Sequence, residues 1–218
     1  AESALAAIAL EPVVNELPSP EWCATARRLG DAVGAVLIFD EMKTGFRLAT
    51  GGYQQFAGIE PDLAAFGKAM ANGFPLAAVV GRAAIMEAAE STWISVTLAG
   101  EATALAAASA VLDIHAEVDV CATLWRVGKE MRERVAAAVQ ASGVPGVRVT
   151  GIDPMWSIEF DDERRQRAFL EGAALEGVLF KRGAYNYASM AHDDDEILLE
   201  IERVASTALV DASEDEEA

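Results

Sequence analysis

Two apolar runs of this sequence end on residues that can do chemistry. Residues 35–40 (AVLIFD) end on Asp40, and residues 61–68 (PDLAAFGK) end on Lys68. The first run is continuous in hydrophobicity rather than alternating, which is typical of a buried strand in a parallel sheet, and we interpret the second as another strand. Ligands of α/β proteins bind beyond the carboxyl ends of such strands. The pattern therefore predicts that Asp40 and Lys68 lie at the ligand-binding edge of one sheet.

A lysine in this position is a candidate nucleophile. Desolvation disfavours the ammonium form, so an apolar setting lowers the pKa of a lysine. The neutral amine can then attack a carbonyl group and form a Schiff base. Lys68 alone is weak evidence, because a lysine after a strand is usually a plain surface residue. An aldolase-type Schiff base without a cofactor is a further hypothesis, but it leaves Asp40 unexplained.

Asp40 suggests which carbonyl compound the lysine would bind. Pyridoxal phosphate combines a lysine Schiff base with an acid at the nitrogen of its pyridine ring. A buried carboxylate needs a charged or hydrogen-bonded partner, and none stands beside Asp40 in the sequence. We therefore expect a partner that is distant in the chain or is a cofactor; the alternative is a cap of the following turn. Met42 lies two residues further on, so an extended chain would place it on the same side, against the ring.

The bulk composition excludes several functional classes. The chain has 218 residues, of which 52% are hydrophobic and 24% charged, and this indicates a globular protein. Its net charge of −18 argues against nucleic-acid binding, which needs a basic face. No apolar run reaches the roughly 18 residues that a membrane helix needs. Cys23 and Cys121 have neither metal-ligand nor disulfide spacing, so we expect no metal site and a location in the reducing cytoplasm.

The order of the expected elements indicates an α/β fold with a mostly parallel sheet, followed by a small α+β domain. In the first part we expect strands near residues 4–13, 35–40, 61–68 and 75–81, and helices near 19–34, 82–90 and 99–116. In the second part we expect strands near 147–151, 155–160 and 177–183, and helices near 124–143, 162–177 and 192–210. We place the large domain at 1–111, the small domain at 112–206 and an acidic, disordered tail at 207–218.

Three longer blocks of the sequence carry a resemblance to a known family. Residues 37–47 (LIFDEMKTGFR), 61–81 (PDLAAFGKAMANGFPLAAVVG) and 96–110 (VTLAGEATALAAASA) resemble, in order and spacing, the signature blocks of class-III aminotransferases. The resemblance runs from about Leu5 to the last helix and is closest to the branch around glutamate-semialdehyde aminomutase. It implies a pyridoxal-phosphate enzyme of fold type I, of which this chain forms the C-terminal half of the large domain plus the small domain.

The resemblance implies roles for individual residues by their positions in these blocks. Asp40 matches the acid that pairs with the pyridine nitrogen, Met42 the residue that covers a face of the ring, and Lys68 the lysine that holds the cofactor as a Schiff base. Thr97 matches a threonine that reaches across a dimer interface to the phosphate of the partner subunit's cofactor, which implies a homodimer. Glu41 matches a position that we interpret as mainly structural, although it can also lie near the substrate.

The sequence departs from the family pattern in two ways. Lys43 replaces a small or apolar residue of the aminomutases, which leaves the substrate open. Family members are also much longer, and the N-terminal half that binds the cofactor phosphate at a helix N-terminus has no counterpart here. The sheet edge and apolar face left uncovered would need a separate chain that supplies this half, a missing segment or self-association.

The implied function is pyridoxal-phosphate-dependent amino-group transfer between a small amine or amino acid and a keto acid or aldehyde, or an amino shift within one substrate. The alternative is a catalytically incomplete fragment or an interaction module that keeps the aminotransferase fold. We interpret His115 and His192 as structural. Tyr185 and Tyr187 are candidates for the substrate pocket, because in the full-length family this region approaches the substrate.

Overall fold

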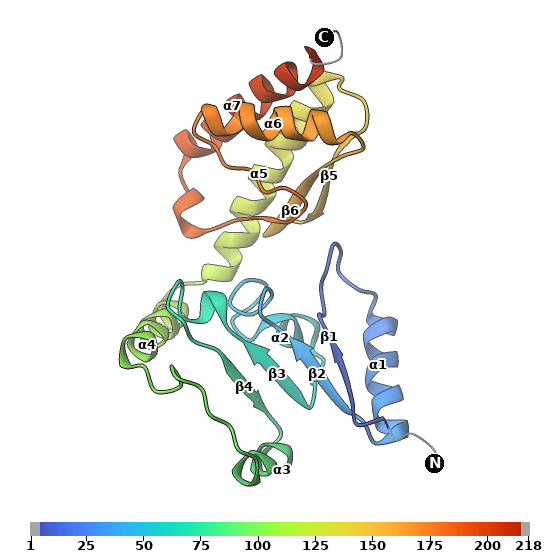
Figure 1. The fold of residues 1–218 in the computed structure, drawn as a ribbon, viewed down its shortest axis with the longest axis vertical. Helices are drawn as coiled ribbons and strands as arrows, with labels where there is room; N and C mark the ends of the chain where they lie inside the picture. Colours follow the sequence, from blue (N-terminus) through green and yellow to red (C-terminus); the bar gives the residue numbers. More distant parts are fainter. Residues whose placement is uncertain (1–4, 215–218) are drawn as a thin grey trace. The chain divides into compact units, whose positions relative to one another are not determined.

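The chain folds into two compact units, and the division between them falls between Cys121 and Ala122. The structure is a computed structural model and describes residues 5–214. Figure 1 labels the α-helices of both units and all strands except β7. The predicted boundary between residues 111 and 112 instead falls inside a helix that continues to Glu117, so the division comes only after that helix has ended.

Four strands form the sheet of the N-terminal unit. They are β1 (Ala7–Leu10), β2 (Val36–Asp40), β3 (Leu63–Phe66) and β4 (Ala78–Gly81), in that order across the sheet. β1, β2 and β3 are parallel to one another, whereas β4 pairs antiparallel with β3. The four arrows lie side by side in Figure 1. The predicted α/β fold with a mostly parallel sheet is therefore confirmed.

Helices and turns connect these strands and follow the last of them. They are α1 (Pro20–Val33), α2 (Gly52–Ala57), α3 (Ala83–Met86) and α4 (Ala102–Glu117), with 3-10 turns η1 (Lys68–Met70) and η2 (Glu87–Ser91). The residue before α1, Ser19, is its predicted N-cap, and its hydroxyl accepts a hydrogen bond from Trp22 N at 3.2 Å. The helix ends at Gly34, whose φ of 70° lies in the left-handed region that favours glycine.

A buried aspartate ties the elements at the amino ends of β2 and β3 together. Asp62 stands just before β3, and its side chain is only 5% exposed. Its carboxylate accepts hydrogen bonds from Leu37 N at 2.7 Å and from Arg27 at 2.8 Å, and it forms an ion pair with Arg82 at 2.9 Å. Burial would raise the pKa of Asp62, but the Leu37 amide and the guanidinium groups outweigh burial and hold this pKa below its usual range. One carboxylate thus fixes α1, β2 and the residue after β4.

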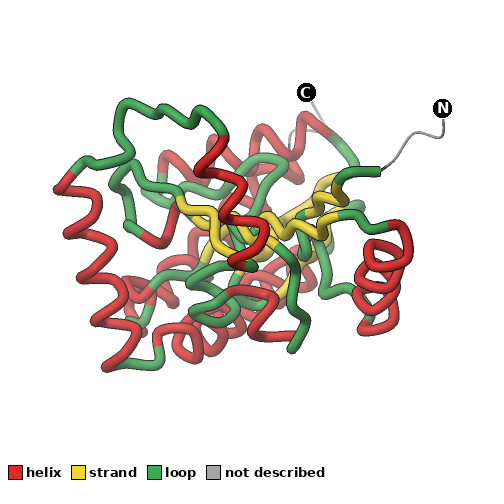
Figure 2. The backbone as a smooth tube through the Cα atoms, turned by 90° about the horizontal axis from the view of Figure 1, so that it is seen from below, coloured by secondary structure: helices red, strands yellow, loops and turns green. Residues whose placement is uncertain are grey.

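The C-terminal unit consists of an antiparallel sheet and packed helices. Its elements are α5 (Val120–Ser142), which begins just before the boundary, β5 (Val147–Ile152), β6 (Met155–Phe160), α6 (Glu163–Leu175), β7 (Asn186–Tyr187), η3 (Met190–His192) and α7 (Asp195–Glu214). The sheet order is β5-β6-β7, with both pairs antiparallel. Figure 2 distinguishes the helices and strands by colour. The apolar core of this unit includes the fully buried side chains of Trp156 and Phe169.

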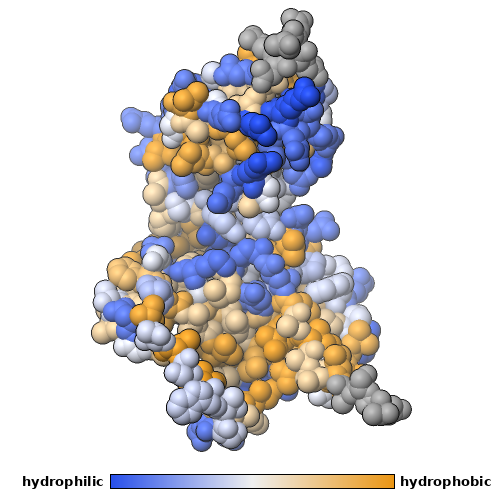
Figure 3. Space-filling view, viewed as in Figure 1, coloured by the Kyte–Doolittle hydropathy of each residue, from blue (hydrophilic) through white to orange (hydrophobic). Residues whose placement is uncertain are grey.

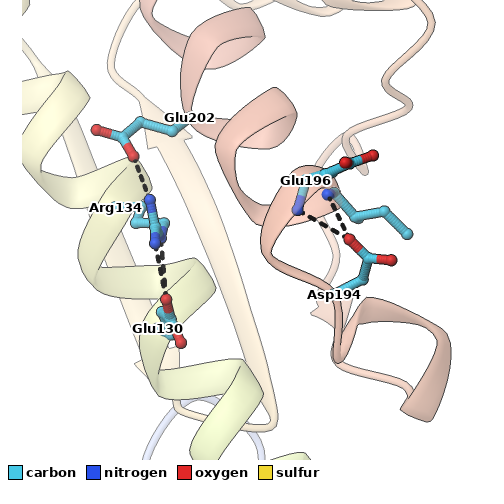
Figure 4. Close-up of polar contacts among 6 residues, drawn as sticks. Glu130, Arg134, Asp194, Glu196 and Glu202 are labelled. Atoms are coloured by element: carbon cyan, nitrogen blue, oxygen red, sulfur yellow. Dashed lines mark hydrogen bonds and ion pairs between the residues drawn. The ribbon is translucent and has the colours of Figure 1, made fainter.

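Polar contacts at the start and along the length of α7 complete this unit. Arg134 of α5 forms ion pairs with Glu130 of the same helix at 2.8 Å and with Glu202 of α7 at 2.7 Å (Figure 4). Such partly exposed pairs contribute little stability one by one, but this one joins two helices. At the N-terminus of α7, Asp194 Oδ1 accepts a hydrogen bond from Glu196 N at 2.8 Å (Figure 4). A carboxylate is favourable there because it faces the free N–H groups of the helix.

The expected strand at residues 177–183 is wrong. Gly177 and Gly183 have φ values of 90° and 58°, and these left-handed conformations bend the chain away from an extended path. The strand forms later instead, as the short β7 that pairs with β6. The side chain of Asn186 in β7 closes the intervening loop, because its Oδ1 accepts a hydrogen bond from Lys181 N at 2.9 Å.

The expected disordered tail is also wrong over the part that the structure describes. Residues 207–214 belong to α7. Ala208, Leu209 and Ala212 are buried in the core of the C-terminal unit, so packing against this core stabilises the segment as a helix. Residues 215–218 lie outside the described residues.

Two properties of the described residues bear on the class of function. No helix between residues 5 and 214 has the length and apolar character that crossing a membrane requires. In the same part of the chain, no group of three or more His, Cys, Asp or Glu side chains is arranged to hold a metal ion. Both cysteines are free and buried.

Replacing Asp62 by asparagine should destabilise the N-terminal unit by about 2–3 kcal/mol, because Arg27 and Arg82 lose this buried anionic partner, although Arg27 keeps its ion pair with Asp31. Urea denaturation of the chain and the variant measures the difference. The matched control is Glu60→Gln, which changes an exposed carboxylate nearby and should alter stability by less than about 0.5 kcal/mol.

The stability difference between the chain and Asp62→Asn should depend on pH. Because the pKa of Asp62 is lowered in the folded state, its stabilisation is present above the unfolded value of about 3.9 and is lost as the pH falls through the folded value. The difference should therefore shrink below about pH 4. A difference that stays constant into acid would contradict this assignment.

Candidate functional site

The carboxyl ends of β2 and β3 bring Asp40 and Lys68 to the same edge of the sheet. Asp40 is the last residue of β2 and is the register partner of Ala65 in β3. β3 ends at Phe66, so Lys68 follows its carboxyl end after a single glycine. Because β2 and β3 are parallel neighbours, their carboxyl ends lie next to each other (Figure 1). The two residues therefore share the edge at which α/β proteins bind ligands.

Asp40 is exposed at this edge, so the expectation of a buried aspartate is wrong. Its Oδ1 accepts a hydrogen bond from Met42 N at 3.0 Å, which makes it the cap of the turn after β2. Within residues 5–214 its carboxylate has no ion pair and no second hydrogen bond. The buried carboxylate of the two is its neighbour Glu41, at 1% exposure. Adjacent residues of an extended chain point to opposite sides, which explains why only one of them faces inward.

Glu41 caps the helix that follows the turn. Its Oε2 accepts hydrogen bonds from Tyr53 N at 2.8 Å and from the Thr44 hydroxyl, and its Oε1 accepts one from Gln54 N at 2.8 Å. Gly52 has no room for a side chain beside this carboxylate, and its φ of 78° also favours glycine. Burial raises the pKa of Glu41, although the three donors oppose the shift. The structural interpretation of Glu41 therefore fits its position.

Lys68 projects from an otherwise buried turn. Its φ of 45° lies in the left-handed region, which lysine rarely adopts. The residues two positions away on either side, Phe66 and Met70, are buried in an apolar cluster with Phe46 and Ala64. The Lys68 side chain is exposed, and its Nζ has no ion pair or hydrogen bond within the described part of the chain. The apolar setting expected from the sequence thus surrounds its backbone rather than its amine. Such backbone strain clusters at functional sites.

Met42 reaches this edge by a different route from the one expected. The chain turns directly after β2, so Met42 lies in a turn rather than in an extended segment. Its thioether lies over Gly67: a Cβ at Gly67 would be 2.5 Å from Met42 Cε and 2.8 Å from Sδ. The absence of a Cβ at Gly67 therefore leaves room for the end of the Met42 side chain, which lies beside the residue before Lys68.

Thr97 is not joined to this edge by any hydrogen bond among residues 5–214. It lies in an exposed segment of residues 92–100, which has no helix or strand. The large apolar side chains of this segment are also exposed, with Trp93 at 92%, Ile94 at 68% and Val96 at 66%. Thr97 is therefore an exposed residue on an apolar surface of the N-terminal unit.

The sequence did not predict one ion pair at the sheet edge. Lys43 Nζ pairs with the carboxylate of Glu11, which directly follows β1. Leu10 and Phe39 are register partners, so Glu11 and Asp40 occupy equivalent positions at the ends of neighbouring strands. The sequence did contain a signal for the position of Glu11, because Glu11 ends an apolar run in the same way as Asp40. The ion pair ties the turn after β2 to the end of β1.

Two tyrosines, one just before β7 and one within it, line a cavity in the C-terminal unit. Tyr185 and Tyr187 line this cavity of about 410 Å³, together with Trp156 and Phe180. His192 also touches it, and its Nδ1 accepts a hydrogen bond from Ser189 N at 3.0 Å. All residues that line the cavity belong to the C-terminal unit.

Replacing Glu41 by alanine should destabilise the N-terminal unit by about 2–4 kcal/mol, because three buried donors lose their acceptor. Glu41→Gln is the matched variant, since it keeps the shape of the side chain and one acceptor oxygen, and it should cost clearly less. Urea denaturation compares the two variants. Equal stability of the alanine and glutamine variants would contradict the capping role.

Replacing Lys68 by glycine should stabilise the chain by up to about 1 kcal/mol, because glycine adopts the left-handed conformation without a Cβ penalty. The matched control is Lys129→Gly, at an exposed position inside α5, which should destabilise by about 1 kcal/mol. Thermal or urea unfolding measures both. If the two glycine substitutions destabilise equally, the backbone of Lys68 is not strained.

Comparison with known proteins identifies a family and several structures with a similar fold. The family model described as aminotransferase class-III matches residues 1–192 of this chain. A FumI protein from Sphingopyxis sp. MTA144, solved in its PLP internal aldimine form, is 28% identical with a TM-score of 0.89; the match covers 98% of this chain and 53% of that one. An omega-transaminase from Sphaerobacter thermophilus is 26% identical with a TM-score of 0.79, over 95% of this chain and 52% of that one.

A more distant structure supports the fold alone. The ornithine aminotransferase from Toxoplasma gondii is 21% identical with a TM-score of 0.83, and the match covers 97% of this chain and 52% of that one. This chain therefore spans about half the length of the structures it matches. With the family model matching most of its length, this chain belongs to the class-III aminotransferases.

Proposed function

We propose that this chain carries the cofactor-binding lysine and acid of a pyridoxal-phosphate-dependent enzyme that transfers amino groups. The observation that carries the proposal is the placement of Asp40 and Lys68 at the ends of neighbouring parallel strands, each with an ionic group that no other described residue neutralises. Membership of a family that uses pyridoxal phosphate supports it. Either charge alone could be an ordinary surface group, so the proposal rests on their occurrence together at adjacent strand ends.

The residues at this edge fit the ring and the aldehyde of pyridoxal phosphate. Asp40 uses one oxygen for its own turn and keeps the other for a donor such as a protonated ring nitrogen. Lys68 offers an unpaired amine for the aldehyde carbon. The Met42 thioether over Gly67 provides an apolar, polarisable surface between them, suited to the face of an aromatic ring.

The phosphate end needs partners that α2 and α4 do not offer. Helix N-termini bind phosphate through their free N–H groups. In α2 these groups are bound by Glu41, and in α4 Glu101 accepts hydrogen bonds from Thr103 N at 2.9 Å and Ala104 N at 2.6 Å. We infer that the phosphate is held by Thr97 of a second subunit in a homodimer and by groups outside this chain, which a separate polypeptide could supply.

The proposed roles follow from the properties of the side chains. When bound, pyridoxal phosphate supplies a ring that accepts electrons from the reacting carbon of the substrate. Lys68 would hold the cofactor and, once an incoming amine has replaced it, would act through Nζ as the base that removes the α-proton and as the acid that returns it. Asp40, as a carboxylate, would keep the proton on the ring nitrogen. Met42 would orient the ring by packing on its face.

The substrate class follows only from this chemistry. The donor would be a small amine or amino acid and the acceptor a keto acid or aldehyde. An amino shift within one molecule, as in the aminomutase-like branch, uses the same residues and is the narrower alternative. The two free cysteines support a reducing compartment, for which we propose the cytoplasm.

A second candidate function is an incomplete fragment or interaction module with an aminotransferase fold. It is favoured by the length of the match and by the exposed apolar surface of the N-terminal unit. Figure 3 shows broad orange areas on this unit. On α4, Leu105, Leu112 and Ile114 are each about half exposed, at 49%, 51% and 52%. Patches of this kind mark surfaces that bind another polypeptide.

Binding of pyridoxal phosphate separates the two candidate functions. We expect the chain mixed with pyridoxal phosphate to gain an absorbance band toward the visible and, after borohydride reduction, a mass increase on the peptide that contains Lys68. Lys68→Ala should lose both signals, whereas Lys129→Ala removes an exposed lysine of α5 and should keep both. Asp40→Asn should retain the adduct but release unreduced cofactor faster. Label spread evenly over the other lysines would contradict the first function and favour the second.

A further inference from the structure

Helix α4 has one packed face, and that face ends on a histidine. Ala104 and Ala108 are buried, at 0% and 8% exposure, and Val111 and His115 follow on the same face. Val111 packs against the apolar cluster of Phe46, Ala64, Phe66 and Met70, which surrounds the backbone of Lys68. His115 is therefore the polar end of the surface by which α4 packs beside the Lys68 turn.

His115 holds the loop after Glu41 through two contacts. Its Nδ1 lies 3.0 Å from the Thr50 hydroxyl, within hydrogen-bond distance. The rings of His115 and Phe46 meet edge to face, with centroids 5.3 Å apart and an interplanar angle of 88°. The carbonyl oxygen of Thr50 also accepts a hydrogen bond from Phe46 N, at 3.2 Å. His115, Thr50 and Phe46 thus form a closed triangle of contacts between α4 and this loop.

Phe46 passes this contact on to the strand that leads to Lys68. The rings of Phe46 and Phe66 also meet edge to face, with centroids 6.2 Å apart and an interplanar angle of 84°. Gly45 has no room for a side chain, because a Cβ there would lie 2.5 Å from Phe66 Cδ1. Phe46, which packs on Phe66, has a φ of 60°, and Lys68, two residues after Phe66, has a φ of 45°. Both are non-glycine residues in left-handed conformations. Such conformations persist only where the surroundings hold them.

We propose that His115 is a positioning residue for Lys68, acting through Phe46 and Phe66. The proposal rests on the proposed function, since it concerns the reactivity of Lys68 toward pyridoxal phosphate. His115 does not touch the reacting groups. Its contacts to Thr50 and Phe46 keep the Phe46 ring against Phe66, and Phe66 fixes the direction in which the next turn presents the Lys68 amine. An apolar residue at position 115 could fill the space but could not bond to Thr50.

Selective labelling of lysines in the full-length chain tests this role. The chain is exposed briefly to pyridoxal phosphate and reduced with borohydride, and peptide mass spectrometry gives the ratio of label on Lys68 to label on Lys129 in the same sample. We expect His115→Ala to lower this ratio about tenfold, equivalent to about 1.4 kcal/mol in the positioning of the amine. Thr50→Val should lower it in the same direction, since it removes the other end of the hydrogen bond.

Two further variants separate positioning from a general loss of structure. His115→Asn places an amide near the site of Nδ1 and should restore part of the ratio, because it can again bond to Thr50. His192→Ala is the matched control, a histidine that bonds to Ser189 in the C-terminal unit, and should leave the ratio unchanged. Circular dichroism establishes that each variant is folded under the labelling conditions. If His115→Ala does not fold, Thr50→Val and His115→Asn carry the comparison.

The outcomes distinguish this inference from the proposed function. If Lys68 in the unsubstituted chain is labelled no more than Lys129, the proposed function fails, and the positioning role fails with it. If Lys68 is labelled preferentially and the ratio is the same in folded His115→Ala and Thr50→Val, only the positioning role is overturned. A lowered ratio in both variants, partly restored in His115→Asn, supports it.

Discussion

A buried carboxylate determines how the chain leaves the central strand. Glu41 accepts hydrogen bonds from Tyr53 N, Gln54 N and the Thr44 hydroxyl, so the segment after β2 must turn back and begin α2 above the sheet edge. Once Glu41 points inward, Asp40 must point outward, because adjacent residues of a strand alternate. The same turn brings Met42 over Gly67. The positions of the Asp40 and Met42 side chains thus follow from the capping of α2 by Glu41.

The position of Lys68 after β3 depends on residues that pack beside the same turn. Phe46 and Phe66 pack beside the turn that Glu41 holds, and they belong to the apolar cluster around the Lys68 backbone. The cluster restrains Lys68 in a left-handed conformation while leaving its amine exposed. The residues two positions before and after Lys68 are therefore packed, which favours holding its side chain in a fixed direction. A carboxylate and an amine are presented by two neighbouring strands with little freedom in either backbone.

Sequence patterns predicted the features that depend on periodicity and local capping. Continuous apolar runs located the parallel strands, and their ends placed Asp40 and Lys68 on one edge. Patterns failed where the outcome depends on packing between distant segments. Nothing in the order Asp40–Glu41 shows which carboxylate is buried, since the donors for Glu41 come from the start of α2. The acidic residues that begin at Asp211 also obscured the positions of Ala208, Leu209 and Ala212, which pack α7 into its core.

The proposed chemistry and the exposed surface of this chain are two aspects of one arrangement. Lys68 and Asp40 are open to solvent, the residues around Thr97 are exposed and apolar, and the chain spans about half of the structures it matches. A site of this kind gains from further polypeptide that excludes water, since electrostatic interactions strengthen as solvent is removed. In the proposed function, Asp40 and Lys68 are the residues of this chain that would hold the ring and the aldehyde of the cofactor.

The most direct measurement is a crystal structure of the chain after reduction with pyridoxal phosphate and borohydride. The account predicts that the cofactor carbon is bonded to Lys68 Nζ, with the pyridine nitrogen at a hydrogen-bond distance of about 2.7–3.0 Å from the Asp40 carboxylate. The Met42 side chain should lie against the ring. A ring attached to Lys68 but turned away from Asp40, or a cofactor attached to another lysine, would contradict the central claim.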